Sequence, residues 1–136
     1  MMSIVYTGKT YTTGGRSGLS HSDDHRLDIK LSPPGSSGEG TNPEQLFAAG
    51  WSACFIGAMG RAAQEIGVKV PADTSVAAEV DLCSDPDKGF FLQARLNVTL
   101  PGLAHDVAQS LVERAHQICP YSKATRGNIE VALSVL

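Results

Sequence analysis

A long and almost uncharged run near the middle of the chain constrains the fold more than any other feature. Residues 41–59 read TNPEQLFAAGWSACFIGAM, in which Asn42 is a good helix N-cap and Pro43 suits the first helical position. We expect a helix from Pro43 to about Ile66, ended by Gly67. Small and apolar residues recur every three or four positions and predict one inward-facing stripe, made of Leu46, Gly50, Ala53, Cys54, Gly57 and Met59 or Gly60. Since each helical glycine costs ~1 kcal/mol relative to alanine, these glycines indicate close packing against another backbone.

The rest of the chain predicts strands around this helix and a second helix. β-Branched or alternating residues predict strands at 3–11, 27–31, 74–82, 90–100 and 128–136. The two strands at 74–82 and 90–100 form a hairpin around DPDKG, and SPPGSSGEG at 32–40 is a loop. A second helix is expected from His105 to Cys119, with Val107, Leu111, Ala115, Ile118 and Cys119 on one face. This order predicts an α+β fold with antiparallel sheet in a single domain, residues 1–136.

Composition and charge exclude several classes of protein. Hydrophobic residues make up 42% of the 136 residues and charged residues 18%, which is typical of a globular chain. The formal net charge of −3 and the scattered basic residues argue against a nucleic-acid partner. The N-terminus lacks the pattern of a signal peptide, and the uncharged run from Gln45 to Gly60 is too short to span a membrane. We therefore expect a cytoplasmic protein with no membrane partner.

The three cysteines are Cys54, Cys83 and Cys119. Their odd number does not fit a disulfide framework, and no CxxC or Cys–His spacing indicates a zinc site. Cys54 alone could be inert packing, because free cysteine is among the most buried residue types. Cys119, however, lies on the apolar face of the other long helix, so the two thiols can meet if both faces point inward. A thiol pair in a cytoplasmic protein more often takes part in redox chemistry than forms a structural disulfide.

A reactive thiol must be ionised, and burial opposes ionisation. No cation lies one helical turn from Cys54, so the charge must come from elsewhere in the chain. Arg16, within the glycine-rich GGRSG, is one candidate, and a solvated loop arginine is the alternative. Glu44 could hold an arginine in place through a bidentate ion pair. Alternatively, its carboxylate could simply stabilise the first turn of the helix by interacting with the helix dipole. It lies about 15 Å along the helix from Cys54 and so cannot touch it directly.

Other reactive side chains receive no role. The four histidines, His21, His25, His105 and His116, form no cluster in the sequence. Cys83 lies at a strand end beside Ser84 and Asp85, and we treat it as incidental.

Two stretches give the chain a family resemblance. TNPEQLFAAGWSACFIGAM and ICPYSKATRGNIEV resemble the two cysteine motifs of the organic hydroperoxide resistance proteins, within the OsmC/Ohr superfamily of thiol peroxidases. GGRSG is similar to the arginine loop of that family, and LPG before the second helix also fits. Ser17 follows Arg16 where many relatives carry an acidic residue, and Cys83 is outside the family pattern.

The resemblance implies a specific enzyme. By matching positions, Cys54 is the peroxidatic nucleophile, Cys119 the resolving cysteine, Arg16 the thiolate-stabilising group and Glu44 the residue that holds Arg16. Such enzymes reduce organic and fatty-acid hydroperoxides to alcohols through a sulfenic acid and an intramolecular disulfide. They are recycled by dihydrolipoamide or lipoylated proteins and use no metal, haem or flavin. The implied fold is an intertwined homodimer in which antiparallel sheets wrap two long central helices.

Two other hypotheses remain open. The chain could be a lipid- or oxidant-binding, redox-sensing module that is oxidised without turnover. It could also be a dimeric α+β protein with two inert core cysteines.

Overall fold

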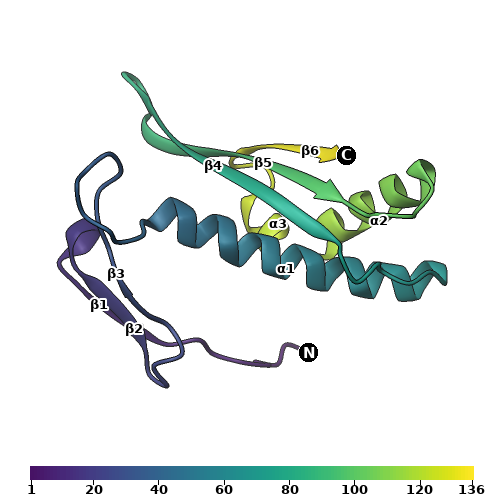
Figure 1. The fold of residues 1–136 in the computed structure, drawn as a ribbon, viewed down its shortest axis with the longest axis horizontal. Helices are drawn as coiled ribbons and strands as arrows, with labels where there is room; N and C mark the ends of the chain where they lie inside the picture. Colours follow the sequence, from purple (N-terminus) through teal and green to yellow (C-terminus); the bar gives the residue numbers. More distant parts are fainter. The chain divides into compact units, whose positions relative to one another are not determined.

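The computed structural model describes residues 1–136, which divide into two compact units, Met1–Leu46 and Phe47–Leu136 (Figure 1). The first unit holds three short strands and a 3-10 turn, and the second holds three strands and most of the helical residues. In chain order the elements are β1 (Thr10–Thr13), η1 (Gly15–Ser17), β2 (Leu19–Ser22), β3 (Asp28–Lys30), α1 (Pro43–Ile66), β4 (Ser75–Asp85), β5 (Gly89–Thr99), α2 (His105–Ile118), α3 (Pro120–Thr125) and β6 (Glu130–Val135). This order is the α+β class predicted from the sequence.

The first unit is built on a three-stranded antiparallel sheet in the order β1-β2-β3. The predicted strand at 3–11 was wrong in its position: pairing begins only at Thr10, opposite Ser22. β-Branched residues form a strand only where another strand offers backbone partners, and residues 3–9 have no partner strand in this chain. β2 was not predicted, because LSHS is short and mostly polar.

α1 begins and ends where its capping residues predict. The side chain of Asn42 accepts a hydrogen bond of 2.9 Å from the backbone N–H of Gln45, which satisfies one free donor of the first turn. Gly67 has a φ of 76°, the left-handed conformation that ends helices. The expected bounds of Pro43 and Ile66 are confirmed.

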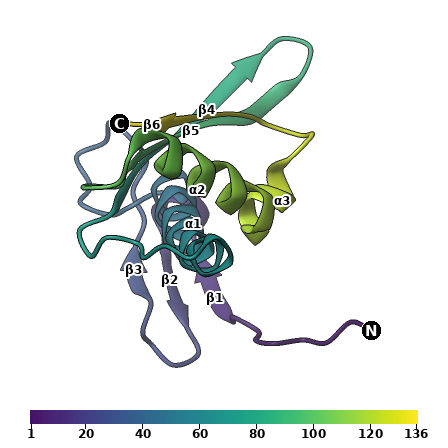
Figure 2. The ribbon, with the colours of Figure 1, turned by 90° about the vertical axis from the view of Figure 1, so that its right-hand side faces the viewer.

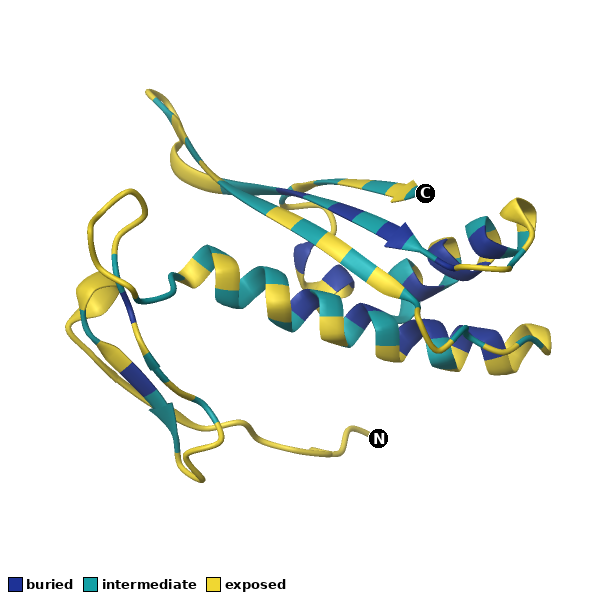
Figure 3. Cartoon of the chain, in the orientation of Figure 1, coloured by how far each residue is buried: buried dark blue, intermediate teal, exposed yellow.

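The buried face of α1 differs from the predicted stripe of small residues. Buried and exposed positions alternate along α1 (Figure 3). Trp51 and Phe55, which lie outside the predicted stripe, are fully buried, as is Met59, which belongs to it, whereas the stripe residues Ala53 and Gly57 are exposed. Large side chains remove the most apolar area from water, so they decide which face turns inward. The close approach of another backbone expected at the glycines does not occur: only Gly50 has a near neighbour, and it is a side chain, the ring of Tyr121, 3.4 Å from an added Cβ.

By length and composition alone, α1 is apolar enough to cross a membrane, with an 18-residue window of mean hydropathy 1.2. This corrects the expectation that its uncharged run is too short. One such helix is weak evidence for a membrane span, because the core helix of a globular protein has the same composition. The buried aromatic face of α1 is that of a core helix.

The second unit contains a mixed sheet in the order β4-β5-β6. β4 and β5 form the predicted antiparallel hairpin around DPDKG, with Ser75 opposite Thr99 and Asp85 opposite Gly89. β6 pairs parallel to β5, which differs from the expected all-antiparallel arrangement. The chain leaves β5, passes through α2 and α3, and returns in the same direction, as a helical crossover requires.

The core of the second unit lies between its helices and one face of this sheet (Figure 2). Fully buried side chains come from α1, from β5 (Leu96 and Val98) and from α2 (Leu111 and Val112). α2 covers almost the whole predicted helix, and Cys119 follows it as its C-cap. α3, by contrast, was expected only as a short turn.

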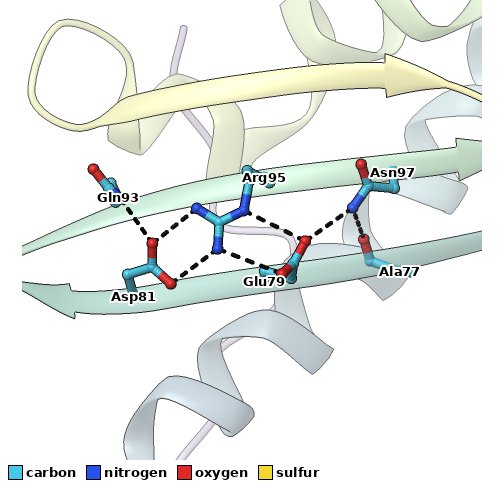
Figure 4. A network of polar contacts seen from close by, with 6 residues as sticks. All are labelled: Ala77, Glu79, Asp81, Gln93, Arg95 and Asn97. Carbon is cyan, nitrogen blue, oxygen red and sulfur yellow. Dashed lines mark hydrogen bonds and ion pairs between the residues drawn. The ribbon is translucent and has the colours of Figure 1, made fainter.

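The outer face of the hairpin is polar, as alternation along a half-buried sheet requires (Figure 4). Arg95 donates two hydrogen bonds to the carboxylate of Asp81, of 2.8 Å and 2.9 Å, and also contacts Glu79. The amide of Gln93 donates a third hydrogen bond to Asp81, of 2.7 Å. These bonds lower the pKa of Asp81 from 3.8 to about 2. Hydrogen bonding by Arg95 is the largest cause of the shift, and hydrogen bonding by Gln93 is the second.

Candidate active site

The structure brings Cys54 and Cys119 together in the second unit. Their Sγ atoms are 3.3 Å apart, and both cysteines are free thiols. Cys54 lies near the middle of α1, and Cys119 lies between α2 and α3. Residues 65 positions apart in the sequence are thus in direct contact, as the sequence predicted for two inward-facing helices.

The backbone fixes Cys119 at the junction of two helices. A residue before proline is disfavoured in the helical conformation, and Cys119 precedes Pro120 with an extended φ of −63° and ψ of 123°. Its N–H still donates to the carbonyl of Ala115 at 2.8 Å, and its carbonyl accepts from the N–H of Lys123 at 3.0 Å. Both backbone groups of Cys119 are therefore satisfied, and its side chain points into the core.

The two thiols differ in exposure. Cys119 is completely buried, whereas Cys54 is half-buried and borders a cavity. A molecule entering that cavity would therefore meet Cys54 first. This asymmetry suits a pair in which one thiol reacts with an external molecule and the other reacts only with its neighbour.

Burial opposes ionisation of Cys54. Desolvation raises the pKa of the Cys54 thiol above its usual 9.0, and the neighbouring thiol of Cys119 raises it further. The backbone N–H of Tyr121, in the first turn of α3, lowers the pKa but does not reverse the shift. A reactive thiolate at Cys54 therefore requires an additional positive charge.

Arg16 and Glu44 form an ion pair within the first unit. The Nη1 atom of Arg16 lies 2.9 Å from Oε1 of Glu44 and donates to Oε2 at 3.2 Å. Only 13% of the Glu44 side chain is exposed, against 45% for Arg16, so the carboxylate is the more fixed partner. A single guanidinium nitrogen makes both contacts, so the pair is not bidentate through two nitrogens, and the remaining N–H donors of Arg16 stay free for other acceptors.

Glycine is essential to the shape of the loop that carries Arg16. Gly14 has a φ of 74°, a conformation that side chains other than glycine rarely adopt. At Gly18, an added Cβ would lie 1.8 Å from the carbonyl oxygen of Thr13. The two glycines therefore let β1 and β2 approach closely, with Arg16 in the 3-10 turn between them.

A cavity of about 600 Å³ adjoins Cys54 in the second unit. Its lining includes Arg61 and Glu65 from α1, Arg114 and Ile118 from α2, and Lys123 from α3. Sequence reasoning missed these cations because it examined only one helical turn on either side of Cys54. Arg61 lies seven residues further on, two turns away on the same face of the helix, so the i, i+7 spacing was the available signal.

A buried hydrogen bond holds α3 against α1 in this region. Nε1 of Trp51 donates to Oγ of Ser122 at 3.2 Å, and both side chains are fully buried. Because α3 follows Cys119 directly, this bond helps fix the position of the resolving candidate relative to Cys54.

The other candidate side chains lie apart from the thiol pair. Cys83 is in β4, opposite Phe91, and is half-buried. The ring of His21 stacks on that of His25 with centroids 4.7 Å apart. His116 is partly buried and lies beside Phe55, and desolvation lowers its pKa. No group of three or more His, Cys, Asp or Glu side chains is arranged to hold a metal ion.

Comparison with known proteins places the chain in a family. Residues 35–134 match the family described as OsmC-like protein. The chain is 47% identical to the organic hydroperoxide resistance protein of Xanthomonas axonopodis pv. citri (strain 306), covering 97% of this chain and 95% of that protein. It is 44% identical to the organic hydroperoxide resistance protein OhrB of Bacillus subtilis (strain 168), with 96% of this chain and 98% of that protein covered.

Solved structures agree with the sequence comparison. The crystal structure of OhrB of Bacillus subtilis matches with a TM-score of 0.91 at 42% identity, over 98% of this chain and all of that one. A Vibrio cholerae structure, described as a putative organic hydroperoxide resistance protein with captopril bound in one of the active sites, matches with a TM-score of 0.91 at 41% identity, covering 98% of this chain and 94% of that one. The chain belongs to the organic hydroperoxide resistance branch of the OsmC/Ohr family.

Proposed function

We propose that the protein is a thiol peroxidase that reduces organic and fatty-acid hydroperoxides to alcohols. The observation that carries the proposal is the 3.3 Å contact between a half-buried thiol, Cys54, and a fully buried one, Cys119. The relatives named organic hydroperoxide resistance proteins support the same substrate class.

In the first step, the Cys54 thiolate attacks the distal oxygen of the hydroperoxide. The O–O bond breaks, the alkoxide takes up a proton and leaves as the alcohol, and Cys54 becomes a sulfenic acid. The sulfur is oxidised by two electrons and the peroxide is reduced by two.

In the second step, the sulfur of Cys119 attacks the sulfenic sulfur of Cys54. A disulfide forms and water leaves, carrying the hydroxyl of the sulfenic acid and one proton. The two sulfur atoms must approach from 3.3 Å to about 2 Å. Dihydrolipoamide, free or on a lipoylated protein, would then supply two electrons and two protons to restore both thiols.

Arg16 and Glu44 complete the proposed site. The guanidinium of Arg16 would supply the positive charge that the raised pKa of Cys54 demands, and it would orient the peroxide. Glu44 would hold Arg16 through their ion pair. The free donors of Arg16 and the limited exposure of Glu44 support these roles.

We also propose that the protein works as a cytoplasmic homodimer, with intertwined chains. The exposed apolar side chains near the N-terminus support this assembly, since Ile4 is 77%, Val5 95% and Tyr6 81% exposed. Static light scattering after gel filtration would report twice the mass of one chain. A single-chain mass at micromolar concentration would contradict the dimer.

The decisive experiment is a single turnover on fully reduced protein. One equivalent of linoleic acid hydroperoxide is added, and the state of each cysteine is mapped by mass spectrometry. We expect rapid formation of a Cys54–Cys119 disulfide, none in Cys54→Ser, and an unchanged yield in the matched control Cys83→Ser. A Cys54 that stays a thiol would overturn the peroxidase. Oxidation that dihydrolipoamide cannot reverse would favour a redox sensor.

A further inference from the structure

The cavity beside Cys54 carries a positive charge that the proposed reaction does not use. Arg61, Arg114 and Lys123 line it, together with a single carboxylate, that of Glu65. Nε of Arg114 lies 2.7 Å from Oε2 of Glu65, and its Nη2 donates to Oε1 at 3.1 Å. Glu65 therefore pairs with Arg114, and neither Arg61 nor Lys123 lies within ion-pair distance of a carboxylate, although the charge of Arg61 helps to lower the pKa of Glu65.

This excess is local. The whole chain has a formal net charge of −3, so two unpaired cations in one cavity do not reflect general composition. Unpaired cations in a concave site attract anions. The position of the cavity beside the half-buried Cys54 thiol makes an anionic group of the substrate the fitting occupant.

The lining between Cys54 and Arg61 consists of small, uncharged residues, which leave room for a carbon chain. The two residues are two helical turns apart on one face, about 10 Å along the axis. Gly57 and Ala58 lie between them, and a Cβ added at Gly57 would meet nothing within 4 Å. Ile118, from α2, adds an apolar side chain to the lining.

The spacing sets the length of the substrate. About 10 Å corresponds to about seven or eight C–C bonds of roughly 1.5 Å in a zigzag chain. A carboxylate at Arg61 would therefore present a hydroperoxide in the middle of a fatty acid to Cys54. A four-carbon peroxide cannot reach both ends.

We propose that Arg61 and Lys123 bind the carboxylate of the substrate and make the enzyme selective for hydroperoxides that carry one. This proposal rests on the proposed peroxidase function. The two side chains are specificity-determining residues: they hold the remote end of the substrate, and the reacting atoms stay at Cys54.

The kinetic test compares linoleic acid hydroperoxide with its methyl ester, which has the same chain but no charge. At subsaturating peroxide, we expect Cys54 of the wild type to be oxidised about fivefold faster by the acid than by the ester. A factor of about five is the scale of one solvent-accessible ion pair. In Arg61→Gln/Lys123→Gln this ratio should fall to about one. The control Lys69→Gln/Lys88→Gln makes the same charge change outside the cavity and should keep the wild-type ratio.

Other kinetic outcomes overturn the proposal. If Arg61→Gln/Lys123→Gln, the cavity variant, slowed the reactions with acid and ester equally, the cations would act on the Cys54 thiolate and not on the substrate carboxylate. An equal loss of selectivity in the control would mean a long-range field effect.

A binding test without peroxide chemistry separates this proposal from the proposed function. Isothermal titration calorimetry on reduced wild type should show tighter binding of decanoate than of decan-1-ol, and the cavity variant should lose that preference. If wild type reduces neither hydroperoxide, the peroxidase fails, yet this titration still decides the subsite. Equal affinities for decanoate and decan-1-ol in wild type would overturn it.

Discussion

The buried hydrogen bond between Trp51 and Ser122 provides a sharp test of how the helix after Cys119 is held in place. Both side chains are fully buried, and a hydrogen bond of 3.2 Å joins the indole N–H of Trp51 in α1 to the hydroxyl of Ser122 in α3. Ser122→Ala would leave the indole N–H buried without an acceptor. An orphaned buried donor costs about 1–3 kcal/mol, so we expect the free energy of unfolding to fall by about 2 kcal/mol.

The same substitution should behave differently once the indole is gone. In Trp51→Phe the hydroxyl of Ser122 has no partner, so replacing it with a methyl group should be nearly neutral. The packing loss of Trp51→Phe is common to both members of that comparison and cancels in a double-mutant cycle. The cycle should therefore give a coupling free energy of about 2 kcal/mol.

Urea unfolding of the four reduced chains would measure this coupling. Far-UV circular dichroism reads the backbone of all four equally, and protein concentration is held constant because a dimer unfolds in a concentration-dependent way. Ser110→Ala, at an exposed position of α2, is the matched control and should change stability by less than about 0.5 kcal/mol. If Ser122→Ala costs the same with and without the indole, to within about 0.5 kcal/mol, the reasoning is wrong.

Three further predictions follow from the electrostatics and the caps. Arg16→Ala should raise the pKa of Cys54, measured by thiolate absorbance at about 240 nm against pH, because only the backbone N–H of Tyr121 would then oppose the effect of burial; an unchanged titration would remove Arg16 from the site. Asp81→Asn should destabilise the protein at neutral pH but progressively less as pH falls from 3.8 to about 2, because the lowered pKa of Asp81 stabilises the fold only while the carboxylate is ionised. Thermal melts across that range check the sign, and a difference that grew in acid would contradict the contact with Arg95. Asn42→Ala should lower the free energy of unfolding by about 1 kcal/mol through loss of the N-cap bond, and Asn42→Asp, which keeps the acceptor, should restore most of it.

Local chemistry explains what the sequence could predict. The bounds of α1 follow from a cap at Asn42 and a left-handed glycine at Gly67, which act within a few residues of the backbone they satisfy. The meeting of Cys54 and Cys119 was predicted on the condition that both apolar faces point inward, and the half-buried position of Cys54 was sufficient for the contact. The ion pair of Arg16 with Glu44 was expected from the family resemblance, because the residues alone suggested only that Glu44 could hold an arginine.

Long-range contacts explain the features that could not be predicted from the sequence. Small residues fit either face of a helix, so the inward face of α1 was decided by Trp51 and Phe55 and not by the stripe that includes Cys54. The parallel pairing of β6 depends on the crossover through α2 and α3, which no local pattern reveals. The cavity cations Arg61 and Lys123 come from different helices and share a site only after folding.

The fully buried indole of Trp51 has a practical consequence. It is the only tryptophan in the chain, it lies three residues before Cys54 in α1, and it contacts the ring of Phe47 and the hydroxyl of Ser122. The tryptophan emission of the protein therefore comes from a single position, three residues before Cys54. We expect oxidation and reduction of the sulfur atoms to change that emission, so that each step can be followed in real time with no dye, label or coupled enzyme.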